Sequence, residues 1–312
     1  MVRYVLAAGL SLAGACGGPP PPSSGRPTVS RAWPVMGTMM SAAAWGGGAD
    51  TARLDGALDA ARDSVERIDS LLSTFRDDSE ISRINRRRGG RLTPAFAAVL
   101  GEALAVARAS GGAFDPTKRH WQGVVFDSMR GTLRLAPGLE LDFGGIAKGY
   151  ALDRAALALV GVADSALLDL GGQFLWVSPR ATRRIVGIAD PDNSLRALAA
   201  VEMRGGSVST SSQAEQPGHI VDPRARLPAR RARSVTVLAP SGMAADAWST
   251  AFFVLGCDSA LALAPRLALD RWRMSLVCAD SGGVRWTAGL EGRVLLPTEG
   301  GGSPGAAPAR AP

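Results

Sequence analysis

Apolar residues recur at helical spacing in four stretches of this chain, and local start and stop signals bound them. A helix is predicted from Asp50, which can cap it, to about Leu72, with its apolar residues three or four apart on one face. A second begins at Thr93-Pro94, a capping residue followed by proline at the first helical position, and ends at Gly111-Gly112. Two further helices are predicted from Lys148 to about Gly161 and from about Ala244 to Leu255, before Gly256.

Short apolar runs between these helices predict strands over residues 139–143, 166–170, 185–188, 234–238 and 274–277. Helices and strands follow one another without the regular rhythm of a doubly wound sheet. The pattern therefore favours an α+β fold, with mixed or antiparallel sheets and packed helices. Two similar segments each place a glycine pair at the end of an expected strand: Leu141-Asp-Phe-Gly-Gly and Leu168-Asp-Leu-Gly-Gly. This short repeat suggests an internal duplication.

The N-terminal residues are typical of an export signal. Residues 1–15 contain Arg3, an apolar run and then small residues, and Cys16 follows before a stretch rich in Pro, Gly and Ser. This pattern resembles a bacterial lipoprotein processing site, with residues 16–33 as a lipidated cysteine and its tether. The alternative is an ordinary secretory signal with an incidental cysteine. Either reading predicts an exported protein, and acylated Cys16 would anchor it to the cell membrane, facing the periplasm or the cell exterior.

Composition narrows the function classes. With 312 residues and 46% hydrophobic residues the chain can form a substantial core, expected over residues 34–299, before a Gly/Pro/Ala-rich tail expected to be disordered over residues 300–312. The net charge of +7 raises nucleic-acid binding as an alternative. However, every basic residue except Lys118 and Lys148 is arginine, which indicates coding bias, and aromatics make up only 5%. We therefore predict no nucleic-acid partner.

The densest candidate chemistry lies in residues 141–150, LDFGGIAKGY. A predicted strand ends in the carboxylate of Asp142, a glycine pair allows close backbone approach, and Lys148 opens a helix. Helix N-termini and lysine both favour anions, so this segment suits a phosphate-binding site. The alternative is a plain connection between a strand and a helix.

Two weaker constellations also carry oxygen and nitrogen ligands. Asp246 and Thr250 share one helix face with Ser249 beside them, an oxygen-rich set that suits Mg²⁺ unless these are simply polar residues of a helix start. His219 precedes Asp222-Pro223 and could orient a phosphate or accept a proton, unless it belongs to a structural turn. Arginines at 224, 226, 230, 231 and 233 follow directly and could add positive potential there, although a solvated surface is the default for such clusters.

Three cysteines are too few for a disulfide scaffold and lack zinc-site spacing. Cys257 follows an apolar run, which favours a buried thiol, whereas a disulfide with Cys278 is the alternative in an oxidising compartment.

Taken in order, several segments resemble the ApbE family, the FAD:protein FMN transferases. They span residues 36 to 255: Met36-Gly37-Thr38, Phe75, Asp78 to Asn85 (DSEISRIN), Gly112-Ala113-Phe114-Asp115-Pro116, residues 141–150, Leu170-Gly171-Gly172, Ser209-Thr210-Ser211, His219-Ile220-Val221-Asp222-Pro223 and Ala245 to Thr250 (ADAWST). The LDxGGIAKGY, HIxDP and ADAxxT segments in this order are specific to the family.

The resemblance implies an ApbE-like, T-fold-related architecture and an enzyme that uses FAD with Mg²⁺. Such enzymes transfer the FMN moiety of FAD to a Ser/Thr hydroxyl of an acceptor flavoprotein through a phosphoester bond and release AMP. Carried over by motif, the flavin site comprises Met36, Phe75, Ala113, Phe114, Asp115, Asp142, Lys148 and Ile220. The metal is held by the Gly145 carbonyl with Asp246, Ser249 and Thr250, and His219 and Asp222 lie at the pyrophosphate as the catalytic pair, His219 being the candidate proton acceptor.

The chain departs from the family pattern at three places. Phe75 stands where Tyr or Trp is common, the segment between Thr210 and His219 is short, and Arg226 replaces the glycine that ends the usual DPxTG turn. These departures affect the expected loop geometry and acceptor choice more than the metal site. Two alternatives stay open: an FAD pyrophosphatase that yields FMN and AMP, and a non-catalytic flavin-binding lipoprotein.

Overall fold

The computed structural model describes residues 28–46, 50–214, 217–297 and 305–306. The predicted signal segment, Cys16 and most of the tether therefore lie outside the described residues, as does most of the predicted C-terminal tail. Within that tail, Gly305–Ala306 form the short strand β17.

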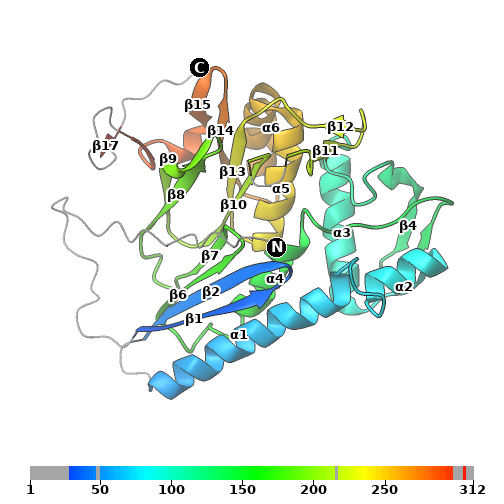
Figure 1. Ribbon diagram of the computed structural model, residues 1–312, viewed down its shortest axis with the longest axis horizontal. Helices are drawn as coiled ribbons and strands as arrows, with labels where there is room; N and C mark the ends of the chain where they lie inside the picture. The colour runs from blue at the N-terminus through cyan, green and yellow to red at the C-terminus, as the bar shows by residue number, and fades with distance from the viewer. Residues whose placement is uncertain (1–27, 47–49, 215–216, 298–304, 307–312) are drawn as a thin grey trace, which may run out of the picture.

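A central antiparallel sheet of eight strands organises the molecule (Figure 1). Its spatial order is β1 (Thr28–Val35), β2 (Thr38–Trp45), β6 (Ser165–Leu170), β7 (Gln173–Val177), β10 (Gly206–Ser212), β13 (Ser234–Ala239), β14 (Ser275–Asp280) and β15 (Gly283–Trp286). The sheet confirms the α+β class and the strands predicted near residues 166–170, 234–238 and 274–277.

The order of elements is doubled along the chain. A strand pair, helices and a second strand pair occur as β1–β2, α1 to α4, β6–β7, and again as β10–β13, α5–α6, β14–β15. Strands β7 and β10 pair antiparallel and join the two halves in one sheet. The duplication is therefore visible in the topology. The short repeat at residues 141–145 and 168–172 is not part of it, because only the second copy begins in a strand, β6.

The four predicted helices are confirmed, with one boundary changed. They are α1 (Thr51–Leu72), α3 (Pro94–Ala109), α4 (Ala147–Ala156) and α5 (Gly242–Leu255). The Asp50 carboxylate accepts the Ala52 amide at 3.1 Å, and the Thr93 hydroxyl accepts the Phe96 amide at 3.3 Å, so both predicted caps form. Helix α4 ends before Gly161, because its last residues tighten into turns in which Leu159 N–H bonds to Ala156 O at 3.0 Å. Two helices were not predicted, α2 (Glu80–Arg87) and α6 (Cys257–Ala268).

The predicted strand over residues 139–143 is wrong. Its apolar alternation is present, since Leu139, Leu141 and Phe143 are buried. However, the Asn85 side-chain amide takes up both backbone groups of Leu141, accepting its N–H at 2.8 Å and donating to its carbonyl at 2.9 Å. The segment is therefore extended but is bonded to a side chain in place of a neighbouring strand.

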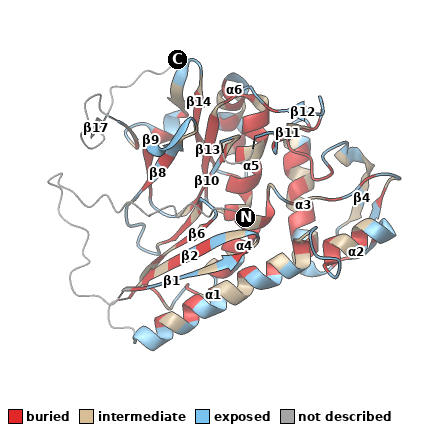
Figure 2. Ribbon diagram, in the orientation of Figure 1, coloured by how far each residue is buried: buried red, intermediate tan, exposed pale blue. Residues whose placement is uncertain are grey.

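Two cores lie on opposite faces of the large sheet. Helices α1, α4, α5 and α6 cover one face, and α5 is buried along almost its whole length (Figure 2). The other face packs against a smaller sheet of β8 (Arg184–Asp190), β9 (Asn193–Met203) and β16 (Val294–Leu296), which β17 extends, and β8 contains the strand predicted at residues 185–188. All six residues of β13 are buried, because both of its faces are covered.

A third unit lies beyond α3, on the side away from the large sheet (Figure 1). It contains α2 and a sheet of β3 (Gly89–Arg91), β5 (Thr132–Leu135) and β4 (Val124–Asp127). A two-stranded hairpin of β11 (Val221–Asp222) and β12 (Leu227–Pro228) stands near the far ends of α3 and α5.

Cys257 and Cys278 form a disulfide that joins the start of α6 to β14. Both cysteines are buried, as expected for Cys257. However, Cys257 is paired in the disulfide and is not the free thiol that the sequence favoured. Among the described helices, none has the length and hydropathy needed to span a bilayer.

Candidate functional site

The segment at residues 141–150 is fixed by hydrogen bonds to side-chain and backbone groups from other parts of the chain. Asn85 on α2 holds Leu141 as described above, and the Pro116 carbonyl accepts the Asp142 amide at 2.7 Å. The Asp142 carboxylate accepts the Gly144 amide at 2.7 Å and pairs with Lys118 at 2.5 Å. Because Lys148 is the second residue of α4, both lysines of the protein serve this segment. Sequence reasoning missed Asn85 and Lys118, although Asn85 ends the DSEISRIN motif.

The loop after α3 is built around Asp115. Its carboxylate accepts three hydrogen bonds, from the Thr117 amide and hydroxyl at 2.7 Å each and from the Trp121 amide at 2.9 Å. Ala113 and Phe114, predicted as flavin contacts, are buried in the same loop. The structure therefore gives Asp115 a role in shaping this loop beside the candidate site.

Phe114, Gly145 and Thr250 meet at one point. A Cβ atom built on Gly145 would lie 3.1 Å from the Thr250 hydroxyl oxygen and 3.2 Å from the Phe114 ring. The glycine allows this close approach of three segments that lie far apart in sequence. The structure thus brings the predicted flavin loop, the glycine pair and the predicted metal helix together.

Asp246 is an almost buried carboxylate, 4% exposed, one turn from Thr250 on α5. Its Oδ2 accepts the Gly149 amide of α4 at 3.0 Å. Ser249 points elsewhere: its hydroxyl donates to the Asp246 carbonyl at 2.9 Å and bonds to the Ser211 hydroxyl of β10 at 2.9 Å. Asp246 and Thr250 therefore face α4 and Gly145, whereas Ser249 lies between α5 and the sheet.

The donor set fits a hard divalent cation. Within the described residues, no cluster of three or more His, Cys, Asp or Glu side chains could hold a metal ion. The predicted set has one carboxylate, Asp246, which forms no salt bridge with the described residues, together with hydroxyl and carbonyl oxygens. Oxygen ligands of this kind suit Mg²⁺, which keeps several non-protein ligands. A buried carboxylate without a basic partner is stabilised by a cation.

The crossing of α4 and α5 places Asp246. Asp153 of α4 accepts the Gly242 amide at 2.6 Å and the Met243 amide at 2.9 Å, and so caps the start of α5. Burial, together with the negative charges of Asp246 and Glu102, raises the pKa of the Asp153 carboxyl to about 6, although the two amide hydrogen bonds act to lower it. No sequence signal identified Asp153, because its partners lie about 90 residues away and depend on helix packing.

The hairpin β11–β12 borders the same region. The Asp222 carboxylate is held by the Arg224 guanidinium, with contacts of 2.9 and 2.8 Å, and this pairing lowers the pKa of Asp222. A Cβ built on Gly112 would lie 4.0 Å from Arg224, so the hairpin touches the loop after α3. Ile220 is buried and His219 is exposed next to it. Of the predicted catalytic pair, Asp222 is thus engaged as an ionised partner of Arg224, and His219 lies at the surface.

Met36 and Phe75 lie on two other loops. Met36 and Gly37 form the two-residue turn of the β1–β2 hairpin, with φ of 52° and 69°. Phe75 follows α1, and its side chain is 99% exposed. The contacts that unite Phe114, Gly145 and Thr250 do not include these two residues.

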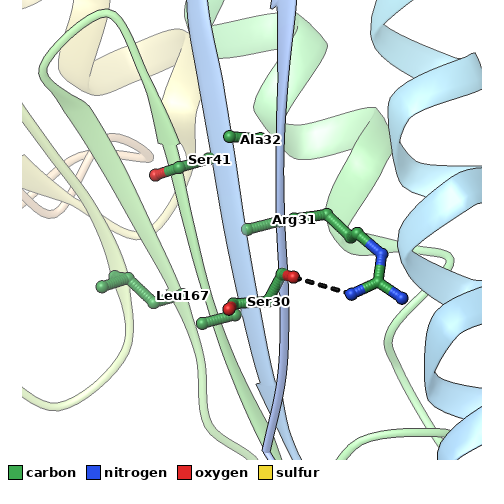
Figure 3. A pocket seen from close by; sticks show the side chains of 7 residues that line it. Ser30, Arg31, Ala32, Ser41 and Leu167 are labelled. Atoms are coloured by element: carbon green, nitrogen blue, oxygen red, sulfur yellow. Dashed lines mark hydrogen bonds between the residues drawn. The ribbon is translucent and has the colours of Figure 1, made fainter. Parts of the chain in front are cut away.

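Two hollows lie apart from this convergence. One, of about 360 Å³, is lined by residues of β1, β2 and β6, including Ser30, Ala32, Ser41 and Leu167 (Figure 3). The other, of about 160 Å³, lies between α2 and β3 and is lined by Arg83, Arg87 and Arg91 among others. None of the predicted site residues lines either hollow.

Comparisons with known proteins agree with this arrangement. The model of the ApbE family matches residues 36–121 and 117–271. An FAD:protein FMN transferase of Treponema pallidum is 30% identical over 292 residues, covering 75% of this chain and 80% of the relative. The ApbE protein of Thermotoga maritima superposes with a TM-score of 0.75 at 24% identity, covering 84% of this chain and 98% of that structure. The flavin transferase ApbE of Vibrio cholerae gives 0.70 at 22% identity, covering 86% and 99%. The segments, the topology and the matched residues together show that the chain belongs to the ApbE family.

Proposed function

We propose that this protein is an FAD:protein FMN transferase, which moves the FMN moiety of FAD to a Ser or Thr hydroxyl of an acceptor flavoprotein. The observation that carries the proposal is the convergence of Phe114, Gly145 and Thr250 beside the almost buried Asp246. A related protein from Treponema pallidum bears the same activity as its name.

Asp246 and Thr250 with the Gly145 carbonyl would hold Mg²⁺, and Ser249 would support them from the sheet side. When bound, the cation would neutralise charge on the pyrophosphate oxygens. Lys148 in the first turn of α4 would add positive charge, and the helix terminus itself favours an anion. Arg224, which lies close to the loop after α3 and pairs with Asp222, would bring a further basic group to this region.

The bond changes are those of a phosphoryl-group transfer. The acceptor oxygen forms a bond to the FMN-side phosphorus, and the bond from that phosphorus to the bridging oxygen breaks, so AMP leaves with the electron pair. The proton of the acceptor hydroxyl passes to a base, for which we propose His219. Asp222 is unsuited to this role because Arg224 keeps its pKa low. Asp222 instead would fix the hairpin that presents His219.

Phe75 would supply a stacking surface for a ring of FAD. An aromatic side chain that is 99% exposed on a loop is available to a planar ligand. Replacing it by Ala should weaken FAD binding, and the fluorescence of FAD titrated with protein measures this.

The deciding experiment mixes the protein with FAD, Mg²⁺ and an acceptor domain that contains a Thr acceptor site. Transfer leaves flavin fluorescence on the denatured acceptor, and mass spectrometry should find the mass of an FMN phosphoester with an equal amount of AMP. Free FMN with AMP and an unmodified acceptor would instead identify an FAD pyrophosphatase. An Asp246→Ala variant that binds FAD but neither transfers nor hydrolyses would discard a purely flavin-binding role.

We also propose that the protein is exported and anchored at the membrane by acylated Cys16. The Cys257–Cys278 disulfide supports an oxidising compartment. A Cys16→Ser variant should move from the membrane fraction to the soluble exported fraction, and its retention in the membrane fraction would contradict the anchor.

A further inference from the structure

Helices α4 and α5 touch through two glycines. A Cβ atom on Gly149 would lie 2.0 Å from the Gly242 carbonyl oxygen, and one on Gly242 would lie 2.4 Å from the Gly149 carbonyl oxygen. Both close neighbours are backbone atoms, so no side-chain rotation could make room. This contact brings the Gly149 amide to 3.0 Å from Oδ2 of Asp246. The orientation of the Asp246 carboxylate therefore depends on how closely the two helices meet.

Three side chains hold the Gly242 end of this contact. Gln173 of β7 donates to the Gly242 carbonyl at 2.9 Å, and Ser241 caps the Ala244 amide at 3.1 Å. Asp153 accepts both the Gly242 and Met243 amides. Of the three, only Asp153 belongs to α4, the helix whose Gly149 amide binds Asp246. It thus ties α5 directly to the helix that orients the carboxylate.

Asp153 is an unfavourable choice for an ordinary helix cap. It is partly buried, and the carboxylates of Asp246 and Glu102 act on it with like charge. A neutral Asn would avoid this repulsion, but it would offer one acceptor oxygen where the carboxylate offers two. The repulsion is offset when a cation lies at Asp246, because the local negative charge then falls. A carboxylate in this place is thus suited to a state in which the site holds a cation.

We propose that Asp153 is a positioning residue, which locks α5 against α4 so that Asp246 is oriented for the cation before the cation binds. The link between the helices stands on the contacts alone, whereas the identity of the ligand as Mg²⁺ rests on the proposed function. The role is separate from that of the residues that would touch the metal or FAD.

The test compares Asp153→Asn with Asp50→Asn in the full chain. Both variants change a capping aspartate to its amide, but Asp50 caps α1, away from the α4–α5 contact. In the structure the Gly242 and Met243 amides bind different oxygens of Asp153, and Asn replaces one of these oxygens with an NH2 donor, so the capping bond to that atom is lost in the present geometry. In metal-free protein, hydrogen exchange followed by NMR should show the Gly149 amide exchanging at least about tenfold faster in Asp153→Asn. Asp50→Asn should leave that amide as in the original protein.

A second measurement uses Mg²⁺ itself. Asp153→Asn should raise the Mg²⁺ concentration for half-maximal transfer by about tenfold, with kcat at saturating Mg²⁺ within about threefold. Competition with Mn²⁺, read by its paramagnetic resonance, gives the metal affinity without turnover. Asp153→Glu keeps the charge but shifts it by one methylene, so its Mg²⁺ affinity should lie between those of the original protein and of Asp153→Asn. It replaces the Asn variant if the latter does not fold.

The outcomes separate the two claims. Unchanged Gly149 exchange and unchanged metal affinity in Asp153→Asn would overturn the positioning role. Absence of FMN transfer and of metal binding in the unmodified protein would overturn the proposed function, while the exchange of the Gly149 amide would still decide whether Asp153 locks the helices.

Discussion

Two helical glycines should respond to alanine in opposite directions. Gly56 lies on the exposed side of α1, and a Cβ added there meets nothing within 4 Å. Gly56→Ala should raise the free energy of unfolding by about 1 kcal/mol, because alanine loses less backbone entropy in a helix. At Gly149 the same gain is opposed by the Gly242 carbonyl, 2.0 Å from the new methyl carbon.

The size of the loss at Gly149 follows from these contacts. To restore an ordinary contact, the helices must separate by more than about 1 Å. Overpacking of this kind typically lowers the free energy of unfolding by about 1–3 kcal/mol. That separation also lengthens the bond of 3.0 Å from the Gly149 amide to Asp246, and a hydrogen bond to a charged group contributes about 1.5–3 kcal/mol. Gly149→Ala should therefore lower the free energy of unfolding by about 3 kcal/mol or more.

Urea unfolding followed by circular dichroism measures both variants under one condition. The expected result is a higher midpoint for Gly56→Ala and a much lower one for Gly149→Ala. If Gly149→Ala were as stable as the original protein, the helices would not meet through these glycines and the account of how Asp246 is oriented would fall with it.

Three further predictions concern other parts of the chain. Reducing the Cys257–Cys278 disulfide, which closes a loop of 21 residues, should lower the free energy of unfolding by about 3 kcal/mol, so an unchanged melting temperature in dithiothreitol would contradict it. Arg226 has a φ of 57°, so Arg226→Gly should stabilise the protein by about 1 kcal/mol in thermal melts, whereas a lower melting temperature would show that the arginine makes a stronger contact. Because the folded-state pKa of Asp153 is raised to about 6 from 3.8, the folded state binds this proton more tightly, and its contribution to stability is greatest below pH 4 and falls as the pH rises to 6. The Asp153→Asn variant should lack this fall. The difference in free energy of unfolding between the variant and the original protein should therefore change by at most about 3 kcal/mol from pH 4 to 7, and parallel stability curves over that range would refute the prediction.

Features set by neighbouring residues were predictable from the sequence. The caps at Asp50 and Thr93 depend on amides two or three residues away, and both form as expected. The face shared by Asp246 and Thr250 follows from helical periodicity, and the structure shows the pair on α5. Short-range sequence patterns therefore predicted the starts of these two helices and the two candidate metal ligands on α5.

Features set by distant partners were not. The alternation at residues 139–143 reports burial correctly, but it cannot reveal that Asn85, 56 residues from Leu141, takes the bonds that a neighbouring strand would have made. Lys118 and Asp153 act through partners 24 and about 90 residues away. Ser249 has the right spacing for the metal face, yet the serines of β10 give its hydroxyl a different environment.

The doubled order of elements explains why the candidate site depends on long-range contacts. Helix α4 belongs to the first half and α5 to the second, and the sheet joins the halves through β7 and β10. Gln173 of β7 donates both to the Gly242 carbonyl of α5, at 2.9 Å, and to the Ser207 hydroxyl of β10, at 3.3 Å. The same side chain thus joins the strands of the two halves to the helix that carries Asp246. Because Gly149 and Asp153 come from one half and Asp246 from the other, the oriented carboxylate is a property of the junction, and neither half could present it alone.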